Sequence, residues 1–342
     1  MNHEMFWLPL FVSFAISAFL LSLIIFFGRF LVLPDKRKSK RHLHRAGILR
    51  FGGIAIIVSF VSVLVLDKNL IITQPLMAVL IASFLILVIG VVDDVKQLSW
   101  REQLFFQFFI VIFVYIMGVR LDYVTNPFGG IFLLDGFFWQ GVGLVFSVAW
   151  IVFLMNAMNW VDGVDGASSG IAIIGVVTIF FLSLRPEVNQ PPVAIICAAL
   201  IGSILAFLFL NFYPAKVLAG TSGSMFMGFI LGITAIFSGA KIATTLLVLA
   251  VPIIDAIWVI GERLKAGDSI FSPDKRHLHF RLLDLGWSVK KICFFYYLVT
   301  AVVAFIALNT RAMGKSLTLL LVALIMLGVY TFIKRKTAAF EK

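Results

Sequence analysis

The sequence FFWQGVGLVFSVAWIVFLM, residues 137–155, contains no charged side chain and is followed directly by NAMNWVDGVDGASSG, residues 156–170. An apolar run of about 20 residues is long enough for one helix to cross the hydrocarbon core of a membrane. The second segment carries an amide or a carboxylate at every third position, at Asn156, Asn159, Asp162 and Asp165. The two segments together predict a transmembrane helix with a polar site at its end.

The composition of the whole chain is that of a membrane protein. Of the 342 residues, 61% are hydrophobic and 13% are charged, whereas a soluble domain has about 25% charged residues. Lipid offers the backbone no hydrogen-bond partners, so only helices or a closed barrel can cross it, and long unbroken apolar runs favour helices. Cys197 and Cys293 each lie in an apolar run and suggest neither a disulfide framework nor a zinc site. We expect an all-α polytopic integral membrane protein with residues 1–342 in a single membrane-embedded domain.

Apolar runs predict about eleven transmembrane spans. They cover residues 6–33, 51–66, 74–92, 103–119, 137–157, 167–184, 192–213, 224–240, 242–260, 292–309 and 316–333. With the N-terminus outside, 22 of the 28 Lys and Arg residues fall on the inner side, as the positive-inside rule requires. We therefore expect an N-out/C-in topology, and we assign the net charge of +11 to topology and anionic lipid rather than to nucleic acid.

The longest outer loop, RLDYVTNPFGGIFLLDG, covers residues 120–136. Its β-branched and aromatic residues flank Asn-Pro and Gly-Gly turn signals, so it predicts a small hairpin at the membrane interface. No repeat at a fixed period is evident along the chain, so the inverted repeat that is typical of many transporters is not indicated.

The polar motifs gather at the cytoplasmic ends of the predicted spans, in the loops 34–50, 93–102, 156–166, 211–224 and 261–291. Asp93 and Asp94 end the third span, where two adjacent carboxylates repel each other and charge near hydrocarbon is costly. They predict a divalent-cation site, because Mg²⁺ takes carboxylate oxygens and leaves positions for substrate phosphates. A solvated helix end is the alternative.

The segment 156–170 is the most specific of these motifs. Asn156 and Asn159 are three residues apart and can share one face of the helix end. A glycine follows each of Asp162 and Asp165, which predicts a tight loop that carries both carboxylates. A capped turn between helices is the alternative, although an ordinary turn does not need four polar residues at regular spacing.

Two further motifs indicate phosphate binding. GTSGS, residues 220–224, opens a helix whose exposed N–H groups suit a phosphate, although a simple Ser/Thr cap is an equal alternative. His277 and His279 lie beside Arg276 and Arg281, and with no cysteine nearby a phosphate clamp is more natural than a zinc site.

The loop PDKRKSKRHLHRAGILRFGG, residues 34–53, repeats the His-Leu-His triplet within a basic segment. It predicts either a second group of phosphate contacts or a positive-inside loop that serves only topology. Gly228 and Gly232 form a GxxxG pattern, which is more typical of helix packing than of function.

Taken in order, these motifs resemble those of the polyprenyl-phosphate N-acetylhexosamine-1-phosphate transferase family, over about residues 35–286. VVDDVKQLS is similar to the family's DD motif, NAMNWVDGVDG to its NxxNxxDGxDG motif, NFYPAKVLAGTSGS to its third motif and PDKRHLHFRL to its histidine motif. The likeness is greater to the branch that uses UDP-N-acetylglucosamine (UDP-GlcNAc) and starts teichoic-acid, O-antigen and similar envelope polymers. It implies a transferase of the bacterial inner membrane, with eleven spans and an active site that faces the cytoplasm.

The resemblance also implies the chemistry and the residues. An ionised polyprenyl phosphate attacks the β-phosphorus of a UDP-sugar, UMP leaves, and Mg²⁺, with Mn²⁺ as an alternative, bridges the diphosphate. Asp93 and Asp94 are then the base or positioning carboxylates. The implied metal ligands are Asn159, Asp162 and Thr221, and the implied substrate-binding residues are Asn156, Asp165, Arg50, His44, Gly220, Ser224, Asp255, Arg276, His277, His279 and Arg281. The implied partners are the UDP-sugar, a polyprenyl-phosphate lipid and membrane lipids, and the sequence leaves the oligomeric state open, with a homodimer as one option.

The sequence departs from the family pattern at three positions. Thr221 stands where the GDxGS motif usually has an Asp that binds magnesium, so a neighbour such as Asp162 compensates, or the metal affinity is altered, or the enzyme is inactive. Phe280 stands where a third histidine is usual, and Leu49 replaces the usual proline of the first loop.

Three other functions stay open at this point. A phospho-N-acetylmuramoyl-pentapeptide transferase shares the same motifs and differs in its donor. A transporter or lipid scrambler would place ionisable residues in both halves of several spans, whereas here they collect at one face. A degenerate paralogue that binds prenyl lipid without turnover is compatible with Thr221.

Overall fold

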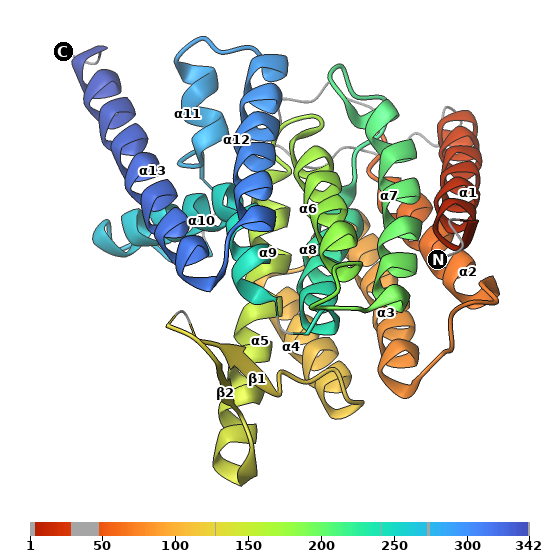
Figure 1. Ribbon diagram of the computed structural model, residues 1–342. Coiled ribbons are helices and arrows are strands. Elements are labelled where there is room, and N and C mark those ends of the chain that lie inside the picture. Colours follow the sequence, from red (N-terminus) through yellow and green to blue (C-terminus); the bar gives the residue numbers. More distant parts are fainter. Residues whose placement is uncertain (1–3, 29–47, 127, 240, 272–273, 341–342) are drawn as a thin grey trace.

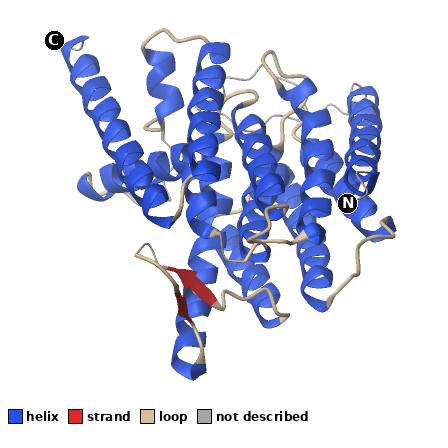
Figure 2. Cartoon of the chain, viewed as in Figure 1, coloured by secondary structure: helices blue, strands red, loops and turns tan. Residues whose placement is uncertain are grey.

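The fold is described from a computed structural model, which covers residues 4–28, 48–126, 128–239, 241–271 and 274–340. In these residues the chain is helical apart from a single hairpin and the connecting loops (Figures 1 and 2). The elements are α1 (Glu4–Gly28), α2 (Gly52–Leu66), α3 (Gln74–Lys96), α4 (Trp100–Ile116), β1 (Tyr123–Thr125), β2 (Ile131–Leu133), α5 (Gly136–Val161), α6 (Ala167–Ser183), α7 (Pro191–Asn211), α8 (Gly220–Phe237), α9 (Ile242–Val248), α10 (Ala250–Lys265), α11 (Leu278–Asp284), α12 (Val289–Asn309) and α13 (Ala312–Phe340).

Helix α8 forms the centre of the bundle. Every residue from Gly220 to Ile236 is buried, and the helix packs against α2, α3, α5 and α6. Small residues permit this close approach: a Cβ on Gly228 would lie 2.3 Å from the carbonyl oxygen of Leu154 on α5. In lipid, helices associate through such close packing because the surrounding tails are as apolar as the helices themselves. The packing role predicted for the GxxxG pattern is therefore confirmed.

Seven helices of the described chain are long and apolar enough to cross a membrane, namely α1, α3, α5, α7, α8, α12 and α13. Helices α9 and α10 make an eighth if they count as one span, but they bend by 77° where they meet. The protein is thus a multi-pass membrane protein, as predicted. The number of eleven spans is not confirmed, because α2, α4 and α6 have 15, 17 and 17 residues, fewer than the about 20 that cross a typical bilayer.

The hairpin predicted in residues 120–136 is confirmed. Strands β1 and β2 pair antiparallel, with Tyr123 opposite Leu133. The Tyr123 hydroxyl donates a hydrogen bond of 2.7 Å to the carbonyl oxygen of Gly239, which ties the hairpin to the turn after α8. Figure 1 shows the hairpin at one end of the bundle and α11 at the opposite end.

The polar loops meet at the end of the bundle away from the hairpin. The C-terminal end of α3 joins the start of α8 through a hydrogen bond from the Thr221 amide to Asp94. The loop between α5 and α6 joins the end of α7 through a hydrogen bond from the Gly166 amide to Asn211. In the described residues these segments thus lie together at one end of the bundle, while the assignment of that end to the cytoplasm stays a prediction.

Candidate active site

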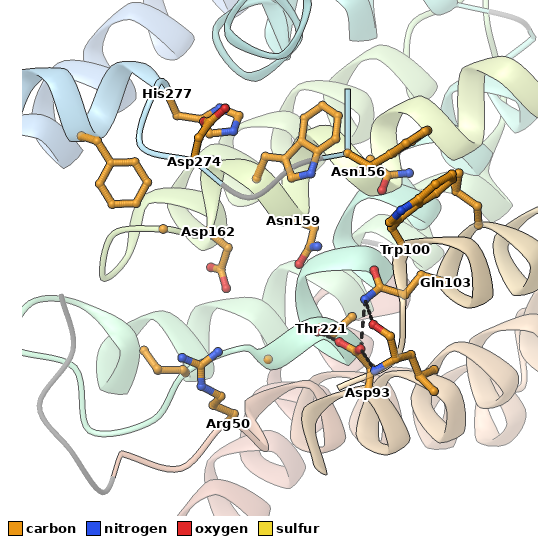
Figure 3. Close-up of a pocket in the computed structure, with 18 residues that line it drawn as sticks. Arg50, Asp93, Trp100, Gln103, Asn156, Asn159, Asp162, Thr221, Asp274 and His277 are labelled. Carbon is orange, nitrogen blue, oxygen red and sulfur yellow. Dashed lines mark hydrogen bonds between the residues drawn. The ribbon is translucent and has the colours of Figure 1, made fainter. Parts of the chain in front are cut away.

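A cavity of about 430 Å³ opens among these converging loops (Figure 3). A volume of this size is typical of small-molecule sites. Its walls come from the end of α3 and the start of α4, the end of α5, the start of α8, the residues just before α2 and the segment that leads into α11. The residues that line it are Arg50, Asp93, Leu98, Trp100, Gln103, Leu104, Asn156, Asn159, Trp160, Asp162, Gly163, Leu218, Gly220, Thr221, Phe271, Asp274, His277 and Phe280.

Asp93 is held by three hydrogen-bond donors. Its Oδ1 accepts from the Leu98 amide and from Gln103 Nε2, both at 2.9 Å. Its Oδ2 accepts from the Thr221 hydroxyl at 2.5 Å. Gln103 reaches Asp93 because α4 starts at a capping box, in which Ser99 and Glu102 bond reciprocally and fix the first turn. The carboxylate therefore lies on the cavity wall with a fixed orientation.

Thr221 also contacts the second carboxylate of the pair. Its backbone N–H donates to Asp94 Oδ2 at 2.9 Å, so one residue binds both Asp93 and Asp94. The preceding Gly220 has a φ of +69°, and a Cβ there would lie 2.3 Å from Asp94 Oδ2. Only glycine fits at that position. The start of α8 is thus shaped to bring hydrogen-bond donors to two adjacent carboxylates that would otherwise repel each other.

The end of α5 supplies the other oxygen groups of the cavity. Asn159 and Asp162 both point into the open space in Figure 3. Asn159 Oδ1 accepts a hydrogen bond of 2.7 Å from Ser224, and Asp162 accepts one from Ser168. Asn156 also lines the cavity, but its amide donates to Gln107 Oε1 at 2.6 Å on the side of α4.

Asp165 lies off the cavity, although it belongs to the same regular pattern. It is 8% exposed, and its Oδ2 accepts a hydrogen bond of 2.9 Å from the Ala215 amide. The next residue, Gly166, has a φ of +85° and donates its N–H to Asn211 at 3.0 Å. Asp165 therefore joins the α5–α6 turn to the segment after α7. Asp165 does not line the cavity, so this placement does not support the substrate-binding role that the resemblance implied for it.

In the histidine motif, too, one residue lines the cavity and its neighbour in the pattern does not. His277 lines the cavity, whereas His279 is fully buried, with its ring 2.3 Å from the place of a Cβ on Gly163. Asp255 lies behind His277, whose Nδ1 is 2.7 Å from Asp255 Oδ2. The carboxylate is 2% exposed and does not line the cavity, so the position predicted for Asp255 in direct contact with substrate is not the one observed.

The two arginines of the motif do not line the cavity, and both pair with acids. Arg276 Nη2 lies 2.6 Å from Asp268 Oδ2, and Arg281 forms an ion pair with Glu262. Hydrogen bonding to Asp268 holds the pKa of Arg276 above its ordinary value, so the guanidinium stays charged. Arg50 is the one Lys or Arg side chain among the described residues on the cavity wall. Of the four residues of the predicted clamp, His277 lines the cavity, whereas Arg276, His279 and Arg281 do not.

The comparisons with known proteins agree with the motifs. The model of glycosyl transferase family 4 matches residues 76–239. A probable undecaprenyl-phosphate N-acetylglucosaminyl 1-phosphate transferase of Bacillus subtilis is 30% identical, over 85% of this chain and 82% of its own length. A decaprenyl-phosphate N-acetylglucosaminephosphotransferase of Mycobacterium tuberculosis is 32% identical, over 86% of this chain and 80% of its own. This chain belongs to glycosyl transferase family 4.

The family 4 protein is an enzyme, a phosphosugar transferase, as the motif resemblance predicted. A phospho-N-acetylmuramoyl-pentapeptide-transferase of Borreliella burgdorferi is 29% identical to it, over 86% of this chain and 93% of its own length. The segment that the family model matches contains Asp93, Asn159, Asp162 and Thr221. His277 lies beyond that segment, in the loop between α10 and α11, and so does Asp255 of α10, which contacts it.

Several cavity residues of the family 4 enzyme were not predicted from the sequence. The rings of Trp100 and Phe271 stack with centroids 4.3 Å apart, and Trp160 forms a further aromatic surface. In a chain with 14% aromatic residues no sequence signal marks these rings out. Asp274 lies only three residues before His277, and its position within the histidine motif was a signal that could have found it.

Asp274 stays ionised although its side chain is partly buried in the cavity wall. Burial by itself favours the neutral carboxyl, but hydrogen bonds from the Arg263 side chain at 2.8 Å and the Arg276 amide at 3.0 Å outweigh it and hold the pKa of Asp274 below its ordinary value. The cavity wall therefore carries a fixed negative charge on the side of His277, opposite the Asp93 side (Figure 3).

The donor set of the cavity suits a hard divalent cation. Within the residues that the structure describes, no group of three or more His, Cys, Asp or Glu side chains is close enough to hold a metal by itself. The side-chain oxygens of the lining residues belong instead to carboxylates, amides and a hydroxyl. Mg²⁺ commonly binds through one or two carboxylates and takes its other ligands from water and substrate phosphates. These residues therefore fit magnesium bound together with a diphosphate, and they fit zinc poorly.

Proposed function

We propose that this family 4 enzyme transfers N-acetylglucosamine-1-phosphate from UDP-GlcNAc to a polyprenyl phosphate, undecaprenyl phosphate in a bacterial inner membrane, and releases UMP. An oxygen of the prenyl phosphate forms a bond to the β-phosphorus, and the bond from that phosphorus to the UMP oxygen breaks. The product is a prenyl-diphosphate-linked sugar, the first membrane intermediate of an envelope polysaccharide. The names of the Bacillus and Mycobacterium relatives support this donor and this class of acceptor.

One observation carries the proposal, namely that Asp93, Asn159, Asp162 and Thr221 share one cavity with Arg50 and His277 at one end of a helical bundle. Two anionic phosphates must approach each other for the reaction to occur, so most of the catalysis must come from positioning and from neutralisation of charge. A site at the boundary of the bundle also lets a lipid present its phosphate while its apolar tail stays in the membrane.

The roles follow from this placement. Asp162 and Asn159, with the hydroxyl of Thr221, would hold Mg²⁺ or Mn²⁺, which when bound would neutralise charge on the diphosphate. Asp93 lies on the wall with its carboxylate held in place, as an oriented base or positioning group needs, and Asp94 supports it through Thr221. Arg50 and His277 stand on opposite sides of the space in Figure 3 and are placed to bind phosphate oxygens.

The finer topology belongs to the same proposal. The short helices α2, α4 and α6 and the bent pair α9–α10 complete eleven crossings, with the N-terminus outside and the C-terminus inside. The loops that carry the cavity then face the cytoplasm, where UDP-sugars are available. The predicted binding residue His44 lies outside the described residues.

The proposal is tested with purified protein, radiolabelled UDP-GlcNAc and undecaprenyl phosphate in detergent micelles. We expect label in the extracted lipid, in proportion to enzyme, with loss of transfer on removal of Mg²⁺ by EDTA. Replacement of both Asp93 and Asp94 by Asn serves as the inactive control. Full transfer by that double variant, or no transfer from any UDP-N-acetylhexosamine, would contradict the proposal.

UDP-N-acetylmuramoyl-pentapeptide should be tested as a second donor, because of the similarity to the Borreliella relative. The Borreliella relative, whose printed name is phospho-N-acetylmuramoyl-pentapeptide-transferase, is 29% identical over 93% of its own length. If UDP-N-acetylmuramoyl-pentapeptide is the better donor by kcat/KM, the enzyme acts in peptidoglycan synthesis instead. The greater identity of the N-acetylglucosamine-phosphate transferases favours UDP-GlcNAc.

A further inference from the structure

Asp255 is a charged group inside the bundle, one layer behind the cavity wall. It lies on α10 and is 2% exposed. Three groups contact its two oxygens: Oδ2 lies 2.7 Å from His277 Nδ1, and Oδ1 accepts from the Leu278 amide at 2.8 Å and from the Tyr330 hydroxyl. A buried carboxylate is costly unless it is paired and hydrogen-bonded, so this set of contacts has to be kept intact in the folded protein.

Tyr330 brings the C-terminal helix α13 into this arrangement. The residue is fully buried, and its ring stacks on Trp258 of α10 with centroids 4.7 Å apart and planes 17° apart. The guanidinium of Arg281 lies 5.6 Å from the centre of the same ring, and Arg281 is itself paired with Glu262. The Tyr330 ring therefore has packing partners on α10 and α11, which restrict the position of its hydroxyl.

The contact with Asp255 determines how His277 faces the cavity. Nδ1 faces the buried carboxylate, so Nε2 lies on the opposite edge of the His277 ring, and the residue lines the cavity. The centroid of the Trp160 ring lies 5.9 Å from that of His277, and the His279 ring stacks parallel to His277 with centroids 5.8 Å apart. A carboxylate on one ring nitrogen sets the tautomer and the orientation of an imidazole.

We propose that Asp255 and Tyr330 are positioning residues for His277, and that α13 is thereby part of the active site. They hold a proton on Nδ1 and keep Nε2 directed at a phosphate oxygen of the substrate. The identity of that phosphate rests on the proposed function, whereas the orientation and tautomer of the ring do not.

Two variants and a matched control test the proposal. Tyr330→Phe removes one donor to Asp255, and Asp255→Asn removes the charge behind His277. Tyr296→Phe is the control, because Tyr296 of α12 is fully buried near Asp255 and, among the described residues, its hydroxyl has no hydrogen-bond partner. With UDP-GlcNAc as donor we expect kcat/KM to fall by about 10-fold in Tyr330→Phe and by about 100-fold in Asp255→Asn, the range typical of outer-shell partners. Tyr296→Phe should match the wild type.

A double-mutant comparison separates positioning from general structure. In a His277→Gln background, neither Tyr330→Phe nor Asp255→Asn should lower kcat/KM further by more than about twofold, because residues that act through one group are not additive. If both variants lower kcat/KM in that background as strongly as in the wild type, they act through the fold and the proposal is overturned.

Histidine-selective nitrogen NMR gives a readout that does not depend on activity. The chain has 5 histidines, and the signal that disappears in His277→Gln identifies His277. We expect a protonated Nδ1 in the wild type and in Tyr296→Phe, and a shift toward a mixture of tautomers in Tyr330→Phe and Asp255→Asn. An unprotonated Nδ1 in the wild type would overturn the proposal even if a variant fails to fold. Absence of sugar transfer by the wild type would instead count against the proposed function alone.

Discussion

Replacement of Thr221 by Asp would put a third carboxylate beside Asp93 and Asp94. In the structure the Thr221 hydroxyl lies 2.5 Å from Asp93 Oδ2 and donates to it. An aspartate there replaces this favourable hydrogen bond with two like charges about 4 Å apart. At an effective dielectric constant of about 20, such a pair costs about 4 kcal/mol. The variant must therefore lose stability without metal, or one of the two carboxylates must bind a proton.

A divalent cation removes this cost because it binds between the two carboxylates. We expect the thermal midpoint of Thr221→Asp in EDTA to lie about 6 °C below that of the wild type, from about 4 kcal/mol and an unfolding entropy of about 2.1 cal/mol/K per residue. Mg²⁺ at 100 times its dissociation constant should restore about 2.7 kcal/mol. The wild type, whose acidic pair is already satisfied by Thr221, should respond to Mg²⁺ much less in the absence of nucleotide.

Controls separate charge from size. Thr221→Asn has nearly the volume of the aspartate variant without its charge, and Thr221→Ser keeps the hydroxyl, so neither should acquire a response to Mg²⁺. Sugar transfer by the same proteins shows whether threonine limits activity: a large gain in Thr221→Asp means that the natural site binds metal weakly, and no gain means that threonine is adequate. Equal stability of Thr221→Asp and wild type in EDTA, with no response to Mg²⁺, would refute the electrostatic reasoning.

Three further substitutions test other parts of the site. Asp93→Asn should lower sugar transfer by about 100-fold or more, the range of an oriented base, while the thermal midpoint changes little. Gly220→Ala should cost about 1–3 kcal/mol of stability, because its φ is +69° and a Cβ would lie 2.3 Å from the carbonyl oxygen of Arg50; Gly141→Ala, with nothing within 4 Å, is the control. Arg50→Gln should raise the KM for the UDP-sugar about 10-fold, by loss of a hydrogen bond to a charged group, whereas Arg276→Gln, away from the cavity, should leave it within about twofold. Equal effects of the two arginine variants would contradict the placement of the phosphate near Arg50.

Local patterns in the sequence determined the class of fold and the family. Span-length apolar runs require helices in lipid, and turn signals between residues 120 and 136 predicted the hairpin. The glycine-rich start of α8 and the packing role of Gly228 were also predicted correctly, because both depend on residues close together in the sequence. The number of spans could not be predicted in this way, since hydropathy does not reveal the 77° bend between α9 and α10.

Only the tertiary structure decided which polar side chains share the cavity. Asp162 and Asp165 are equivalent in the sequence pattern, but the turn between them directs one into the cavity and the other to the segment after α7. Thr221 meets a carboxylate 128 positions away, and Asp255 meets a tyrosine 75 positions away. Regular spacing in a sequence constrains the direction of a side chain only within one helix, whereas contacts of this range depend on how separate helices pack.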